Sequence, residues 1–159
     1  MTYSRTQVIL HWIVVVLIAV QFIYPDGMSA AWRLFRKTGE SDPGPGAYLH
    51  IVFGATILVF MLWRLALRLT KGVPPQPAGD PAWQRIAAAV THWGLYVVLI
   101  LTPVSGSVAW FLGAEAAGEA HEVMTSVIYV LVGLHIAAAL YHQFVQKDGL
   151  MSRMTLRSR

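Results

Sequence analysis

All six histidines of this chain lie within, or at the ends of, long apolar stretches. They are His11, His50, His92, His121, His135 and His142. Polar side chains are costly inside a bilayer and generally mark functional positions there. One histidine is readily explained as an interhelical hydrogen-bonding group, but six of them, without Asp or Glu at the same depth, favour a ligand set. Cysteine is absent, which excludes disulfides, iron–sulfur clusters, thiolate zinc sites and covalent c-type haem.

Three of these histidines share one face of the last apolar stretch. His121, His135 and His142 are separated by 14 and 7 residues, and at about 100° per residue these steps keep them within a stripe of about 60°. At about 1.5 Å per residue, His135 lies about 21 Å from His121 along the helix axis, and His142 about 10.5 Å further. One helix therefore offers an imidazole near each side of a membrane and a third at its edge.

Four apolar stretches are long enough to position these side chains across a bilayer, which takes about 20 helical residues. They cover roughly residues 7–24, 47–68, 88–112 and 123–145. Only 13% of the 159 residues are charged, against about a quarter in soluble domains. We therefore predict an all-α membrane protein, a four-transmembrane-helix up-down bundle that forms a single domain over residues 1–159. The first stretch is predicted to be retained, because it lacks the small-residue cleavage site of a signal peptide.

The connections between the stretches are polar or rich in Pro and Gly. In the loop over residues 25–46, the segment AAWRLFRK is predicted to form a short interfacial turn with Trp32 and Phe35 toward the lipid headgroups. The short link over residues 113–118 makes the third and fourth helices antiparallel neighbours. Pro103 is predicted to kink the third helix.

Lys and Arg are concentrated on one side of the predicted helices, as on the cytoplasmic side of membrane proteins. That side carries Arg5, Arg64, Arg68, Lys71, Arg85, Lys147, Arg153, Arg157 and Arg159. The other side carries only Arg33, Arg36 and Lys37, with six acidic residues. We therefore predict a multi-pass protein of the bacterial inner membrane with both termini in the cytoplasm. No basic patch interleaved with aromatic residues indicates nucleic-acid binding.

The depth of each histidine suggests how they pair. His50 opens the second helix on the side of His121, and His11 lies just inside the first helix, closest in depth to His135. A large planar macrocycle held by two neutral imidazoles in an apolar slot is the arrangement of b-type haem. We therefore predict two haem b groups, stacked across the bilayer, with these four histidines as the iron ligands.

His92 and His142 also lie at cytoplasmic depth. Either is an alternative ligand in place of His11 or His135. The preferred interpretation is that they flank a ubiquinone site beside the inner haem, because imidazole donates hydrogen bonds and protons near neutral pH. Arg85 lies at the same surface and is assigned to this site as well.

Arg64 follows His50 by 14 residues, so the two share nearly the same helix face. Arg64 therefore lies near the depth of the inner haem, where it is predicted to pair with a haem propionate. Extension of its side chain to lipid phosphate is an equal alternative. Gly54 and Gly133 leave room for a porphyrin face, although ordinary packing of small residues explains them equally well.

Longer segments of the chain resemble the bacterial cytochrome b561 family. They are YSRTQVILHWIVVVLI, LHIVFGATILVFMLWRLALRL, HWGLYVVLILTPVSG and HEVMTSVIYVLVGLHIAAALYHQFVQKDGLMSRM. The resemblance covers all four predicted helices. It implies two b haems on His11, His50, His121 and His135, with a quinone near His142. It also implies oxidation of superoxide at the periplasmic face and electron transfer inward to ubiquinone.

Two departures from the superoxide-oxidising members of this family lie at the periplasmic face. The connection between the third and fourth helices is shorter here, and Ala120 replaces a Trp. Superoxide is an anion that positive charge attracts. Arg33, Arg36 and Lys37 offer such charge, whereas the face as a whole is acidic.

The expected function is therefore that of an oxidoreductase. A dihaem b-type cytochrome would take electrons from superoxide at the periplasmic face and pass them to ubiquinone near the cytoplasmic face. The alternative is a membrane electron-transfer subunit that links quinone or quinol to a periplasmic redox protein or small cytochrome. A non-redox structural or transporter-like bundle would leave the six histidines unexplained.

Overall fold

The computed structural model describes residues 3–23, 26–39, 43–76 and 79–156, and within these ranges the chain forms helices and no strand. The α-helices are α1 (Arg5–Ile23), α2 (Asp26–Thr38), α3 (Pro45–Lys71), α4 (Ala82–Leu112) and α5 (Glu115–Tyr141). A π-helical segment, η1 (His142–Gln146), continues α5, and a 3-10 segment, η2 (Leu150–Met154), follows it. Arg157 and Arg159 lie outside the described ranges, as do Glu40 and Asp42, two of the six acidic residues predicted on the side opposite the termini.

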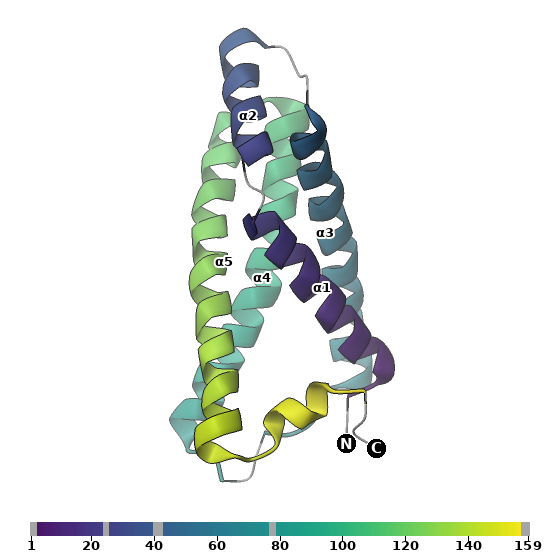
Figure 1. Ribbon diagram of the computed structural model, residues 1–159, viewed down its shortest axis with the longest axis vertical. Coiled ribbons are helices and arrows are strands. Elements are labelled where there is room, and N and C mark those ends of the chain that lie inside the picture. The colour runs from purple at the N-terminus through teal and green to yellow at the C-terminus, as the bar shows by residue number, and fades with distance from the viewer. Residues whose placement is uncertain (1–2, 24–25, 40–42, 77–78, 157–159) are drawn as a thin grey trace.

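Four of these helices are long and apolar enough to cross a membrane, namely α1, α3, α4 and α5 with its η1 extension. The predicted all-α architecture with four membrane-spanning helices is confirmed. Figure 1 shows α3, α4 and α5 running along the long axis, with α1 crossing obliquely in front of them. Helix α2 caps one end of the bundle, called the α2 end below. Both chain termini lie at the opposite end, called the terminal end.

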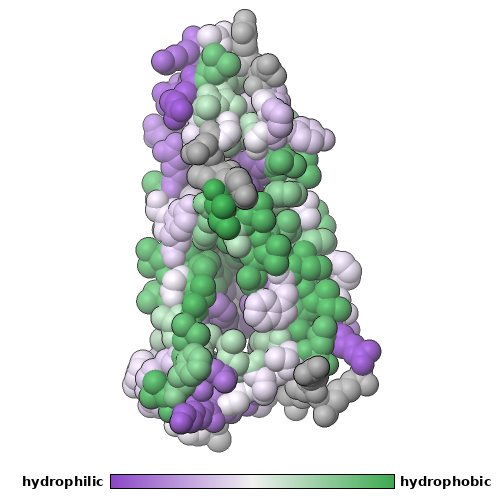
Figure 2. All heavy atoms as spheres, viewed as in Figure 1, coloured by the Kyte–Doolittle hydropathy of each residue, from purple (hydrophilic) through white to green (hydrophobic). Residues whose placement is uncertain are grey.

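The interior between the spans is apolar and draws on all four of them. Its buried side chains are Val14, Ile18, Ile57, Met61, Tyr96, Leu99 and Ile128. Many large apolar side chains face outward instead, such as Val16 at 60% exposure and Val59 at 59%. The same apolar surface covers much of the face in Figure 2. Such exposure would be unfavourable in water, and it matches a bundle whose outer surface is solvated by lipid.

Helices α4 and α5 begin earlier than the apolar stretches predict. They start at Ala82 and Glu115 rather than near residues 88 and 123. Their first turns, AWQRIA and EAAGEAHE, are rich in Ala, Gln and Glu, which favour helix without being apolar enough to mark a membrane span. The link between the two helices is therefore only Gly113 and Ala114, with Gly113 in a left-handed conformation at φ 67°. This link makes α4 and α5 antiparallel neighbours, as predicted.

Helix α2 differs from the predicted interfacial turn. It has 13 residues, and its aromatic side chains face the bundle instead of the headgroups. The rings of Trp32 and Phe35 stack with their centroids 5.6 Å apart. The ring centroids of Phe35 and Trp110 of α4 lie 5.7 Å apart. A Cβ at Gly118 of α5 would lie 2.9 Å from the Trp32 ring, so the missing side chain admits that ring. Burial of apolar rings against α4 and α5 outweighs their preference for the interface.

Candidate functional site

The structure brings His50 of α3 and His121 of α5 together near the α2 end. Their ring centroids lie 6.0 Å apart, and the ring planes are inclined by 63°. A bond from a metal to an imidazole nitrogen is about 2 Å long, so two opposed bonds hold ring centroids roughly 6 Å apart. The pair predicted from depth and spacing therefore has the separation of two axial ligands of one metal ion.

A carbonyl on α4 fixes the orientation of the His121 ring. Its Nδ1 lies 2.8 Å from the backbone oxygen of Thr102, and an Nδ1–H that donates to this carbonyl leaves Nε2 as the nitrogen that can bind a metal. Gly106, one turn further along α4, leaves room for the His121 ring, because a Cβ at position 106 would lie 2.8 Å from Nδ1 of that ring. Neither Thr102 nor Gly106 was predicted from the sequence, where the available signal was a glycine within an otherwise apolar span.

A cavity of about 330 Å³ surrounds this histidine pair. This volume lies within the usual range for small-molecule and cofactor sites, about 300–1,000 Å³. Its walls include Phe22, Trp110 and Tyr129. Within the described residues, Nδ1 of His50 is buried without a hydrogen-bond partner. An apolar slot with two facing imidazoles fits a planar macrocycle with two axial ligands.

Toward the terminal end, three histidines from three helices form a second cluster. His11 of α1 lies 6.2 Å from His135 of α5, and His92 of α4 lies 5.2 Å from His135, measured between ring centroids. The His11–His135 separation matches the spacing of two axial ligands. His92 lies closer still, so the structure is also compatible with the alternative in which it replaces His11. Figure 2 shows hydrophilic atoms recessed between apolar ridges of α1 and α5 on this face.

Arg64 of α3 is partly buried within the bundle near this second cluster. Its Nη1 donates to the backbone oxygen of Gln7 at 3.3 Å. Its Nε is buried and has no hydrogen-bond partner among the described residues. The unused Nε–H could donate to an anionic partner such as a carboxylate.

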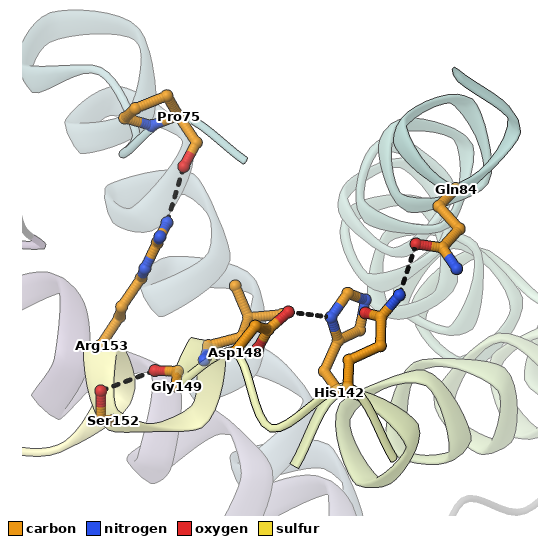
Figure 3. A network of polar contacts seen from close by, with 9 residues as sticks. Pro75, Gln84, His142, Asp148, Gly149, Ser152 and Arg153 are labelled. Carbon is orange, nitrogen blue, oxygen red and sulfur yellow. Dashed lines mark hydrogen bonds and ion pairs between the residues drawn. The ribbon is translucent and has the colours of Figure 1, made fainter. Parts of the chain in front are cut away.

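His142 makes its polar contact with a residue that the sequence analysis did not single out. Its Nδ1 lies 2.5 Å from Oδ2 of Asp148, and the backbone N–H of Leu150 donates to Oδ1 of Asp148 at 2.9 Å (Figure 3). Burial raises the pKa of Asp148, but these two hydrogen bonds, together with nearby charge such as that of Arg153, outweigh burial and keep that pKa below its usual range. The signal that was available is the Asp-Gly pair just beyond the last apolar stretch.

Arg85, predicted to share a site with His142, lies in the first turn of α4. Its guanidinium donates to the backbone oxygen of Asp80 at 2.7 Å. Asp80 in turn lies beside His142. The structure thus places Arg85 next to the His142 region, and it places His92 in the other cluster with His135.

A membrane bundle with paired histidines at two levels defines a class of protein, the membrane-spanning b-type cytochromes. The family model described as prokaryotic cytochrome b561 matches residues 2–156, and the chain belongs to this family. The family membership that the sequence resemblance predicted is therefore confirmed. With it, the chain is assigned as a bacterial multi-pass membrane protein of electron transfer that carries b-type haem.

Several relatives match over nearly their whole length. Cytochrome b562 of Cereibacter sphaeroides is 35% identical over 152 residues, covering 96% of this chain and 94% of the relative. Cytochrome b561 homolog 1 of Escherichia coli is 28% identical and covers 96% of both chains. The probable superoxide oxidase CybB of Yersinia pestis is 27% identical, and the match covers 99% of this chain and 97% of the relative.

Proposed function

We propose that this chain is a dihaem cytochrome that oxidises superoxide at the α2 end and reduces ubiquinone near the terminal end. The observation that carries the proposal is the presence of two histidine clusters at different levels of the bundle. One is built around His121 of α5 and the other around His135 of the same helix. Along a helix, 14 residues correspond to about 21 Å, which separates two centres across most of a bilayer. Haem, when bound, would supply a one-electron carrier at each centre.

The iron ligands in this proposal are His50 and His121 at the α2 end, and His11 and His135 toward the terminal end. His11 is preferred over His92 because its distance from His135 matches that of the His50–His121 pair, 6.2 Å against 6.0 Å. Arg64 would hold a haem propionate through its unused Nε–H. The walls of the cavity at the α2 end would exclude water from the outer centre.

The quinone would bind at the terminal end, beside His142 with Arg85 and His92. The hydrogen bond to Asp148 holds the His142 ring through Nδ1, so Nε2 is the nitrogen that would face a quinone carbonyl and exchange a proton. Each superoxide would lose one electron and leave as dioxygen. Two such electrons and two protons convert ubiquinone to ubiquinol. With both termini in the cytoplasm and the chain in the inner membrane, these protons would be cytoplasmic.

The position of α2 supports superoxide as the donor. Met28, Ser29 and Trp32 of α2 line the cavity around His50 and His121. The same helix exposes Arg33 and Lys37. Arg36 is engaged by Glu115, with Nε 3.3 Å from the carboxylate. A basic helix directly over the outer centre would attract a small anion even though the face as a whole is acidic.

The same helix supports a second candidate, an electron-transfer subunit for a periplasmic redox protein. Beside its cations, α2 exposes Leu34 at 44%. A helix that projects at one end of the bundle with an exposed apolar side chain between charges suits a protein partner (Figure 1).

Stopped-flow reduction of the oxidised protein by superoxide, with and without ubiquinone, tests the proposal. We expect rapid reduction that slows with added salt, followed by reoxidation when quinone is present. The double variant R33Q/K37Q should slow the first phase, whereas R5Q at the opposite end should not. Slow reduction by superoxide in the intact protein would reject the first candidate in favour of the second.

A further inference from the structure

Three side chains of types that can bind metal ions converge at the terminal end. They are distinct from the two histidine pairs. They are Asp80 from the α3–α4 connection, His142 from η1, and Asp148 just after η1. One ligand atom from each lies within 4.8 Å of the others. Segments that are distant in sequence therefore bring two carboxylates and one imidazole to a single point.

This point is largely shielded from solvent. Asp80 is 8% exposed, and the side chains of His142 and Asp148 are 12% and 17% exposed. Two carboxylates that approach each other in such surroundings destabilise one another unless positive charge lies between them. The imidazole of His142, hydrogen-bonded to Asp148, offsets one negative charge at most.

The neighbouring arginines donate their hydrogen bonds to backbone oxygens, while the charge of Arg153 also acts on Asp148. Arg85 donates to the backbone oxygen of Asp80 at 2.7 Å, and Arg153 donates to the backbone oxygen of Pro75 at 2.6 Å. Both bonds fix the course of the backbone around the cluster. A carboxylate oxygen of Asp80 lies within 4.8 Å of a ligand atom of His142 and of Asp148.

The cluster is also held in place before any ligand arrives. Gln146 donates to Gln84 at 3.1 Å and ties η1 to α4, while the Leu150 N–H fixes Asp148. Arg153 ties η2 to the connection that carries Asp80 (Figure 3). Supporting hydrogen bonds of this kind orient metal ligands and commonly raise metal affinity tenfold to about a hundredfold.

From this convergence we infer that Asp80, His142 and Asp148 form a binding site for a divalent transition-metal cation of the zinc type. One imidazole and two carboxylates are a usual three-residue ligand set for such ions, with water completing the coordination. Mg²⁺ and Ca²⁺ prefer more oxygen ligands and no imidazole.

Occupation of the site would also slow quinone reduction, a consequence that rests on the proposed function. A bound cation would be coordinated by the imidazole of His142, which the proposed function assigns to the quinone. Zinc is then expected to reduce the rate of ubiquinone reduction in the natural sequence at the concentration that fills the site. The same zinc concentration should leave the rate of D80N unchanged.

Calorimetric titration of zinc chloride into the haem-loaded full chain, without electron donor or quinone, tests the site. We expect one Zn²⁺ per chain, at least tenfold weaker binding in D80N, H142Q and D148N, and unchanged binding in E119Q, whose carboxylate is exposed at the other end. The haem spectrum of each variant identifies any loss of fold.

Several outcomes would overturn the inference. Absence of saturable binding, equal binding in D80N and the natural sequence, or equal losses in E119Q and D80N would each reject the site. Zinc binding without slower quinone reduction would reject the inhibitory effect and leave the site. Because binding is measured without redox chemistry, failure of the electron-transfer proposal would leave the zinc titration unchanged and would remove only the inhibitory effect.

Discussion

Gly106 on α4 lies directly against the imidazole of His121 on α5. A Cβ at position 106 would lie 2.8 Å from Nδ1 and 2.9 Å from Cε1 of that ring. The ring is rigid, and its Nδ1 is already hydrogen-bonded to the Thr102 oxygen on the same helix. The ring is therefore held against α4 through Nδ1, which leaves Nε2 as the nitrogen that can bind a metal.

Replacing Gly106 by alanine should disturb the outer centre selectively. The added methyl group forces the His121 ring away from α4, and such overpacking costs about 1–3 kcal/mol. We expect G106A to lose the outer haem, measured as a fall from two haems per chain to one. Gly94 provides the control on the same helix, because a Cβ there meets only the end of the flexible Leu131 side chain. Equal haem loss in G94A would contradict this role of Gly106.

The His50–His121 pair should hold one haem independently of the second cluster. Removal of either imidazole, in H50A or H121A, would take away one of the two side chains that would hold the haem iron. Each variant is expected to keep one haem, with a reduced spectrum from the remaining centre. Pyridine haemochrome quantification against protein concentration measures this ratio. Two retained haems in both variants would exclude the pair as ligands.

The cluster of three histidines makes a separate prediction about the inner centre. H11A should lose the inner haem, whereas H92A should keep it, because the His11–His135 distance matches the outer pair. Haem content and the low-spin electron paramagnetic resonance signals of each variant distinguish the two. The reverse result would make His92 the ligand, as its 5.2 Å approach to His135 permits.

His142 should act on the quinone without holding a haem. H142A is expected to retain both haems and to slow ubiquinone reduction by about a hundredfold, the usual size of a general acid–base contribution. D148N should slow the same step and alter its pH profile, because Asp148 fixes the imidazole through Nδ1. Quinone reduction after haem pre-reduction, followed across pH, is the measurement. Loss of a haem in H142A would instead assign His142 as a ligand.

The sequence predicted the architecture well, because membrane spans are specified locally. Twenty or so apolar residues must form a helix in lipid, where each backbone polar group needs an internal partner. The boundaries were less accurate where helices extend beyond the bilayer core. Residues 82–87 and 115–122 are polar helical turns that an apolar pattern does not mark. The aromatic face of α2 was misassigned, because whether Trp32 meets lipid or protein depends on where Trp110 and Gly118 lie.

By itself, the sequence determined the class of fold, the family and the heptad spacing that places His121, His135 and His142 along one face of α5. Those features depend on residue type and on helical periodicity, which are local properties. Only the tertiary structure decided which groups of the other segments meet them. It placed Gly106 and Thr102 against His121, gathered His92 with His11 around His135, and brought Asp80 to His142. These contacts depend on how separate helices and connections pack in three dimensions, and no local pattern in one segment encodes the position of another.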